Sequence, residues 1–285
     1  MAEVENTQSI KFKKTVVCSV INSKGGVGKT TSTFIVGHIL HDLYGLNVLI
    51  VDGDGSCSLT TMCCGKENLS NFENANLYTL ITDEKCNVKD CIVTIADIDL
   101  IPSDQRLEEA ERYIESKGGN VNHVIKKKLK EIIDMNFYDI ILIDSKPTVT
   151  SLTRNYLVAS DYIVLVYQAE YQCLLDSQSI IDAIAQVNDE LAEIGLPQKK
   201  TLGCLITMTN STNLCKEVVE AIKEALNSQN IDIFNATIPR NVKISESTTQ
   251  NLPSNLYAPK SKGNKAYEEF AGELLEKLKK EGIYE

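Results

Sequence analysis

A glycine-rich stretch between an apolar run and a helix-length segment places the strongest constraint on how this chain folds. The apolar run is Val16 to Ile21, and the patterned segment is Lys29 to Tyr44. Between them the sequence passes through Ser23-Lys24-Gly25-Gly26-Val27-Gly28. Glycine has no β-carbon and adopts positive φ angles at little cost, which allows a tight turn. The order therefore predicts a buried strand, a tight loop and a helix in direct succession.

The same loop has the residue types that bind phosphate. Backbone N–H groups in a glycine-rich loop surround anionic oxygens, and the start of the following helix adds partial positive charge. We expect Lys29 to reach the outer phosphates of ATP and the Thr30 hydroxyl to ligate Mg²⁺. The alternative, a glycine turn without a ligand, fits less well because residue types, order and context agree. The expected nucleotide-binding residues here are Lys24, Gly25, Gly26, Val27, Gly28, Lys29, Thr30 and Thr31.

Short apolar runs recur along the chain and alternate with helix-length segments. The runs are continuous rather than alternating, as in strands buried on both faces. This order predicts an α/β fold of the P-loop NTPase type, with a mostly parallel twisted sheet and helices on both faces. The expected strands are Val16 to Ile21, Val48 to Val51, Asp97 to Ile101, Ile140 to Ile143, Ile163 to Val166, Leu202 to Ile206 and Phe234 to Ile238. The expected helices are Lys29 to Tyr44, Val121 to Met135, Gln172 to Ile194, Leu214 to Leu226 and Lys265 to Lys280.

Length and composition fit one large cytoplasmic domain. The chain has 285 residues and a formal net charge of −10. We expect residues 1–14 to be a short polar extension without the apolar core of a secretory signal, and residues 15–285 to form a single domain. Asn68 to Asn76 is expected to be a surface excursion. The nine cysteines contain no CxxC pair, which favours reduced thiols over a metal site.

Carboxylates follow two of the expected strands. Asp52 and Asp54 come directly after one strand, and Asp144 ends another. Carboxyl ends of parallel strands share one edge of a sheet, so these groups should lie near the phosphate loop. We expect Asp144 to hold Mg²⁺ through a water molecule.

The string KGGVGKTT resembles the deviant Walker A family, which includes the ParA and Soj partition ATPases. The resemblance implies that Lys24 crosses a dimer interface to the partner's nucleotide. Asp52-Gly53-Asp54-Gly55 resembles the family's DxDPQ motif, which implies that Asp52 lies near the metal and that Asp54 positions the attacking water. Gly55-Ser56 replaces the usual Pro-Gln. Ser145-Lys146-Pro147 replaces Cys-Pro-Pro. We expect Lys146 to be a solvated lysine, and the alternative is that it contacts phosphate or a partner.

The C-terminal third extends the likeness to the Soj-like branch. Ile238 to Glu246 resembles IPRNVRLSE, and Tyr257 to Gly263 resembles YDPKSKG. The resemblance implies a single ParA-like ATPase domain in which Pro239, Arg240 and Asn241 border the adenine, with Met208 on its other face.

The family likeness also implies function and partners. It suggests an ATP-bound homodimer with slow ATPase activity that binds nonspecific DNA and is stimulated by a ParB-type protein, which would make it nucleoid-associated. A basic patch would have to counter the acidic average, and a solvated lysine face is the alternative. Thr212 stands where Soj-type sequences often carry arginine. The candidate DNA-binding residues are Lys243, Lys260, Lys262 and Lys265.

Three rival functions fit parts of the sequence. A MinD-like membrane switch would use a stripe of Phe270, Leu274, Leu275 and Leu278, but such a stripe more often packs on its own sheet, so no membrane is expected. An iron–sulfur protein would need cysteine where Ser145 stands, and no cluster is expected. An ATP-binding module with negligible hydrolysis remains open.

Overall fold

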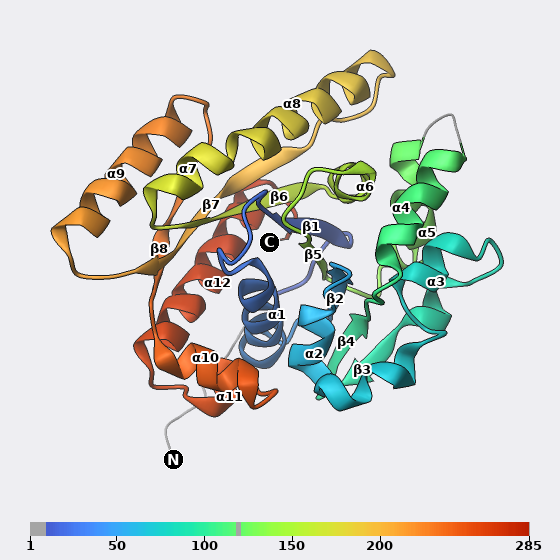
Figure 1. Cartoon of the computed structure of the whole chain (residues 1–285), viewed down its shortest axis with the longest axis horizontal. Helices are drawn as coiled ribbons and strands as arrows, with labels where there is room; N and C mark the ends of the chain where they lie inside the picture. Colours follow the sequence, from blue (N-terminus) through green and yellow to red (C-terminus); the bar gives the residue numbers. More distant parts are fainter. Residues whose placement is uncertain (1–9, 118–120, 285) are drawn as a thin grey trace.

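Eight strands form one sheet at the centre of the computed structural model, which describes residues 10–117 and 121–284 (Figure 1). The strand order is β3-β4-β2-β5-β1-β6-β7-β8, and only the β3–β4 pair is antiparallel. This confirms the expected α/β fold with a mostly parallel sheet. The strands are β1 (Val16–Ile21), β2 (Val48–Gly53), β3 (Val93–Ile95), β4 (Ile98–Ile101), β5 (Ile140–Ser145), β6 (Tyr162–Gln168), β7 (Lys200–Thr209) and β8 (Ile233–Pro239).

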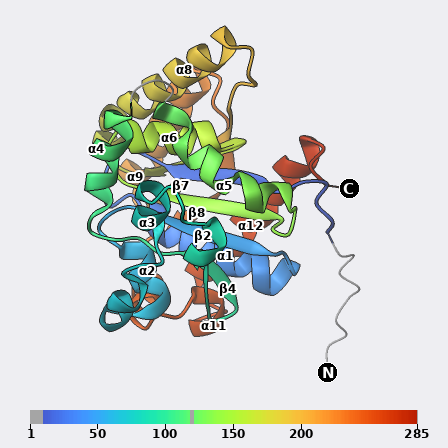
Figure 2. The same ribbon diagram turned by 90° about the vertical axis from the view of Figure 1, so that its right-hand side faces the viewer.

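Helices cover both faces of the sheet (Figure 2). Burial along β5 shows why its apolar run is continuous: Ile140 and Leu142 pack in one hydrophobic cluster, whereas Ile141 and Ile143 pack in the other. The helices are α1 (Lys29–Tyr44), α2 (Ser58–Cys64), α3 (Leu77–Thr82), α4 (Leu107–Ser116), α5 (Val124–Asp134), α6 (Ser151–Ala159), α7 (Tyr171–Asp176), α8 (Gln178–Glu193), α9 (Asn213–Asn227), α10 (Val242–Thr249), α11 (Ser254–Tyr257) and α12 (Lys262–Lys280).

Three of the expected helices differ from the observed ones by more than one residue at an end. The helix expected from Lys265 begins three residues earlier, at Lys262. The helix expected over Gln172 to Ile194 is wrong as one element, because it is interrupted at Ser177 between α7 and α8. The buried Ser177 hydroxyl lies 2.9 Å from Asn22 Oδ1, which ties this break to the segment after β1. The helix expected from Val121 begins instead at Val124, after a 3₁₀ turn. Part of the expected surface excursion is a second 3₁₀ helix, Lys66–Phe72.

The two ends of the described chain meet at the edge of the sheet opposite the phosphate loop (Figure 2). Phe12 and Tyr284 form an antiparallel bridge, and their rings stack with centroids 5.2 Å apart. Residues 1–9 of the expected N-terminal extension lie outside the described residues.

The apolar stripe of α12 is buried within the core. Phe270, Leu274, Leu275 and Leu278 are each at most 3% exposed, so the stripe packs on the chain's own sheet. Within residues 10–117 and 121–284, no helix is both long enough and apolar enough to cross a membrane.

Candidate functional site

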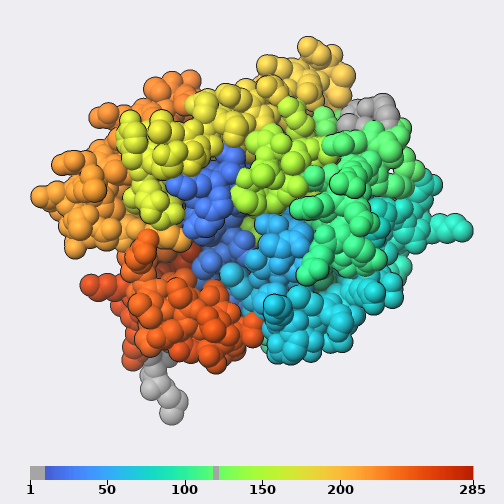
Figure 3. Space-filling view, viewed as in Figure 1, coloured from blue at the N-terminus to red at the C-terminus, as the bar shows by residue number. Residues whose placement is uncertain are grey.

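The glycine-rich loop joins β1 to α1 in the geometry that the sequence predicts. Gly26 and Gly28 have φ angles of 76° and 95°, in the left-handed region that favours glycine. The Thr207 hydroxyl on β7, two strands away from β1 in the sheet, donates a 2.6 Å hydrogen bond to the Val27 carbonyl and so holds the loop. In Figure 3 this first strand, loop and helix segment (blue) lies at the centre of the face, between the yellow α7, the orange-red α10–α11 region and the cyan α2 region.

Lys29 is the first residue of α1 and is 5% exposed. Its ammonium group donates a 3.1 Å hydrogen bond to the Lys24 carbonyl. Burial lowers the pKa of Lys29, whereas the charges of Asp144 and Asp54 act in the opposite direction. This lysine is therefore held beneath the loop, close to Asp144 and Asp54, two of the three carboxylates that the sequence assigns to the site.

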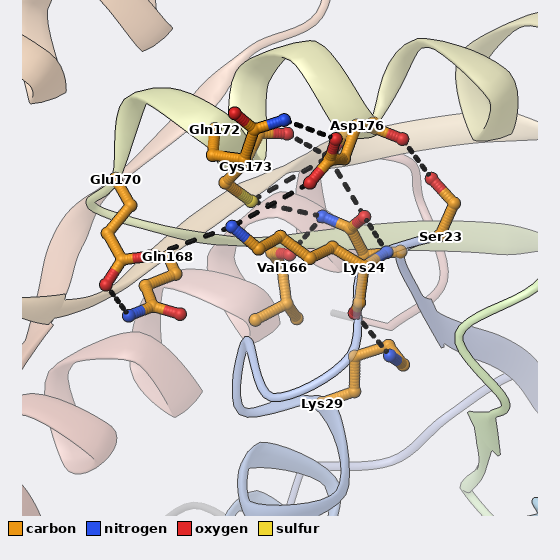
Figure 4. A network of polar contacts seen from close by, with 11 residues as sticks. Ser23, Lys24, Lys29, Val166, Gln168, Glu170, Gln172, Cys173 and Asp176 are labelled. Carbon is orange, nitrogen blue, oxygen red and sulfur yellow. Dashed lines mark hydrogen bonds and ion pairs between the residues drawn. The ribbon is translucent and has the colours of Figure 1, made fainter.

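Lys24 has a different environment, shown in Figure 4. Its backbone N–H donates to Asn22 Oδ1 at 2.8 Å, and its ammonium group lies 3.7 Å from Glu170 and 3.9 Å from Asp176. Both acids flank or belong to α7 of the same chain. The Lys24 side chain thus lies along α7, while Lys29 lies below the loop (Figure 4). The family motif singled out Lys24, but nothing in the sequence identified its two acidic partners or the supporting Asn22 and Ser177.

Asp52 and Asp144 face each other in register on β2 and β5, and both are fully buried. Asp52 accepts hydrogen bonds from the Thr60 N–H (2.8 Å), the Thr60 hydroxyl (2.7 Å) and the Asp54 N–H (3.2 Å). Burial raises the pKa of Asp52 to about 6 despite these hydrogen bonds.

Asp144 has no such support. Neither of its carboxylate oxygens accepts a hydrogen bond from the part of the chain that the structure describes. Burial and then the charge of Asp52 raise its pKa, while Thr30 and Lys29 act in the opposite direction. A buried carboxylate without a partner is costly, and a hard cation with oxygen ligands removes that cost. Asp144, Thr30 and Asp52 therefore fit a Mg²⁺ site beside the phosphate loop.

Asp54 lies in a tight turn directly after β2. Its carboxylate accepts the Ser56 N–H at 2.9 Å, and its carbonyl accepts the Ser103 hydroxyl at 2.7 Å. Gly53, which precedes it, sits where a β-carbon would be 2.4 Å from the Asp144 carbonyl oxygen and 2.7 Å from the Tyr156 ring. Only glycine fits at this position, which fixes where the turn bearing Asp54 begins.

A cavity of about 510 Å³ opens beside the phosphate loop. Its lining brings together all four base-side candidates and the loop side of α1: Gly28, Thr31, Met208, Pro239, Arg240 and Asn241. Tyr267 of α12 also lines this cavity, and its hydroxyl lies 3.1 Å from the Ser32 hydroxyl. Sequence reasoning missed Tyr267, because it lies in a separate helix that the motif did not include.

Lys146 is not the solvated lysine that the sequence suggested. Its side chain is 14% exposed and forms an ion pair with Glu111 of α4, which is 15% exposed. The expectation was wrong because α4, which was not predicted from the sequence, places a carboxylate over the loop after Asp144.

The candidate DNA-binding lysines are all exposed around α10, α11 and the first turn of α12: Lys243, Lys260, Lys262 and Lys265. Lys243 forms a 2.7 Å ion pair with Glu246. Thr212 is the N-cap of α9 and accepts a hydrogen bond from the Cys215 N–H.

Comparisons with known proteins identify relatives over most of this chain. A protein family described as an AAA domain matches residues 15–195. The sporulation initiation inhibitor protein Soj of Bacillus subtilis is 33% identical over 261 residues, covering 90% of this chain and 97% of that protein. The chromosome partitioning protein ParA of Caulobacter vibrioides is 28% identical over 91% of this chain and 93% of its own length.

A crystal structure of a plasmid partition protein from Borrelia burgdorferi bound to AMPPNP is 25% identical, with a TM-score of 0.72 over 93% of this chain and 100% of that one. The family match and the donor set together indicate ATP and Mg²⁺ as the ligands of this site. The chain belongs to the family of ParA/Soj-type partitioning ATPases.

Proposed function

We propose that this chain is an ATP-dependent dimerisation switch with slow ATPase activity, acting in the partitioning of plasmid or chromosomal DNA. The observation that carries the proposal is the fully buried carboxylate of Asp144, which lies beside Lys29 and the phosphate loop and accepts no hydrogen bond from residues 10–117 and 121–284. Such a carboxylate suits a site that is completed by Mg²⁺ and a nucleotide, because a buried carboxylate that accepts no hydrogen bond is costly.

The proposed reaction is ATP + H₂O → ADP + phosphate. Lys29 and the loop N–H groups bind the outer phosphates, and Thr30 with Asp144 and Asp52 holds Mg²⁺, which neutralises charge on the phosphates. Asp54, in the turn beside them, orients the attacking water. Met208, Pro239, Arg240 and Asn241 bind the base in the adjacent cavity.

Dimerisation depends on Lys24 in this proposal. A second cation that reaches the partner's phosphates makes assembly depend on the charge of the bound nucleotide. In this structure the ammonium group of Lys24 lies 3.7 Å from the Glu170 carboxylate and 3.9 Å from the Asp176 carboxylate. These distances are long for ion pairs, which suits a lysine that has to leave both carboxylates to reach the partner's nucleotide.

The DNA surface is formed by Lys243, Lys260, Lys262 and Lys265 in this proposal. α10 carries Lys243, and Asn241, Val242 and Ser245 at its start line the base cavity. The same helix, α10, therefore lines the nucleotide cavity and carries part of the basic surface. The likeness to a chromosome partitioning protein and to a plasmid partition protein supports a DNA cargo and a ParB-type partner that stimulates turnover in a cytoplasmic, nucleoid-associated setting.

The test is to size the protein with ADP and with a nonhydrolysable ATP analogue, each with Mg²⁺ and with or without a random-sequence DNA duplex. We expect a monomer with ADP, a dimer with the analogue, and a dimer–DNA complex that dissociates at high salt. A monomer under every condition would contradict the switch. Analogue-dependent dimers without measurable phosphate release from ATP would favour the ATP-binding module over the ATPase. A dimer that binds anionic vesicles but not DNA would favour the MinD-like alternative.

A further inference from the structure

Helix α4 holds the loop that follows Asp144. The Glu111 carboxylate accepts the Lys146 ammonium group and, at 2.7 Å, the Thr150 hydroxyl. Thr150 is also the N-cap of α6. Residues 145–150 are therefore attached at both ends of the loop to one carboxylate. Because the side chains of Lys146 and Glu111 are only 14% and 15% exposed, this ion pair is poorly screened by solvent.

The same loop rests on the phosphate loop. The Ser145 hydroxyl donates a 3.1 Å hydrogen bond to the Val20 carbonyl at the end of β1. The Pro147 ring lies 3.8 Å from the position that a β-carbon would take on Gly25. A shift of residues 145–150 would therefore displace the backbone that surrounds the phosphates.

The first turn of α4 meets the other loop of the site. A β-carbon on Gly55 would lie 3.6 Å from Leu107 Cβ, so the backbone after Asp54 packs against Leu107. Just before α4, the Ser103 hydroxyl donates to the Asp54 carbonyl. Leu107 and Glu111 are four residues apart, so they lie on the same face of α4. One face of α4 thus contacts two loops of the site: the turn that carries Asp54 and the loop that follows Asp144.

We propose that Glu111 is a positioning residue that makes these two loops move as one unit. Through Lys146 and Thr150 it fixes the loop after Asp144 relative to the Asp54 turn, and so sets the distance between the water-orienting group and the metal site. This inference rests on the ATPase function proposed above. Lys146 is the cationic partner, and removal of either member leaves the other charge poorly compensated.

The kinetic test compares five variants with the wild type. Glu111→Gln and Lys146→Met should lower kcat by about 10- to 100-fold, as a small misplacement of reacting groups does, with KM for ATP changed by less than about threefold. The double variant should be no slower than the slower single variant, because both changes break the same link. Lys146→Arg keeps the charge and should retain turnover near that of the wild type. Glu108→Gln, on an exposed residue of the same helix turn, is the matched control and should also stay near wild type.

Amide hydrogen exchange of the nucleotide-free proteins gives a readout that does not need hydrolysis. In Glu111→Gln, exchange should become at least about tenfold faster in both 145–150 and 53–57, while the central strands keep their protection. Faster exchange confined to 145–150 would overturn the coupling, as would unchanged kcat in both single variants. If the wild type hydrolyses no ATP, the proposed ATPase function fails, and the exchange result alone decides whether Glu111 couples the loops.

Discussion

Lys24 Nζ lies 3.7 Å from the Glu170 carboxylate of its own chain, so that the side chain runs along α7 instead of toward Lys29 (Figure 4). Before Lys24 can reach a partner's nucleotide it has to leave Glu170 and Asp176. Partly exposed ion pairs of this kind contribute ~0.5–1 kcal/mol. We therefore predict that Glu170→Gln tightens ATP-dependent dimerisation by about two- to fivefold, measured as the dimer dissociation constant by sedimentation with a nonhydrolysable analogue.

The controls separate release of Lys24 from a general loss of negative charge. Glu193→Gln, on the exposed end of α8, should leave the dimer dissociation constant unchanged. Lys24→Ala should bind ATP but remain monomeric. A dimer of undiminished strength in Lys24→Ala would remove Lys24 from the interface altogether.

Asp54 and Lys29 should separate hydrolysis from binding. Asp54 is in the turn beside the metal site and, among the described residues, forms no hydrogen bond or ion pair with the phosphate loop, so Asp54→Ala should bind ATP normally, lose turnover and accumulate as a dimer. Lys29→Ala removes a buried cation beneath the loop and should lose most nucleotide affinity. Calorimetry with ATP and Mg²⁺ measures affinity, and phosphate release measures turnover. Normal turnover in Asp54→Ala would show that another group orients the water.

Gly53 and Gly55 form a matched pair for testing the turn geometry. A β-carbon on Gly53 would sit 2.4 Å from the Asp144 carbonyl oxygen, whereas one on Gly55 meets no atom closer than 3.6 Å. Gly53→Ala should therefore lower the free energy of unfolding by ~1–3 kcal/mol, as overpacking does, and reduce Mg²⁺-dependent ATP binding. Gly55→Ala should change stability by less than about 0.5 kcal/mol. Urea denaturation of both variants checks this, and equal stabilities would contradict the packing argument.

Local sequence signals predicted the centre of this fold well. The glycine-rich loop marked the start of α1, and the expected and observed helix have the same bounds, with Gly45 in a left-handed conformation just after its last residue. The strands that are buried on both faces were equally clear. The errors lie where a tertiary contact determines the local structure. The expected long helix is interrupted at Ser177, whose hydroxyl is hydrogen-bonded to Asn22. The ion pair with Glu111 holds Lys146 inward. Those contacts join residues 35 or more positions apart and leave no periodic signal.

The burial of His38 leads to a prediction of how the free energy of unfolding depends on pH. It is 2% exposed on α1, its ring packs edge-on against Phe34 at 5.0 Å, and burial lowers its pKa from 6.5 to about 4, with Asp42 acting in the opposite direction. Because the folded state disfavours the protonated ring, the contribution of His38 to the free energy of unfolding is fully present above pH 6.5 and is lost as the pH falls toward 4.

The expected loss through His38 is ~3 kcal/mol over that interval. His38→Leu should therefore flatten the fall in the free energy of unfolding between pH 7 and pH 4.5. Denaturant titrations at several pH values measure this slope. The same slope in the variant and the wild type would show that His38 does not control the acid sensitivity.

The lysines around α12 should differ in their effect on DNA binding. Lys262 is exposed and makes no hydrogen bond or ion pair with any residue that the structure describes, whereas Lys243 already pairs with Glu246 at 2.7 Å. An unpaired lysine can release counterions from a phosphate without first breaking an ion pair. Lys262→Gln should therefore weaken binding to random duplex and lower the slope of log K against log salt by about one, and Lys243→Gln should have a smaller effect. Lys130→Gln, which removes the same charge from α5, should leave both the affinity and the slope unchanged. If all three variants lose affinity equally, the binding responds to net charge and the surface around α12 is not the DNA site.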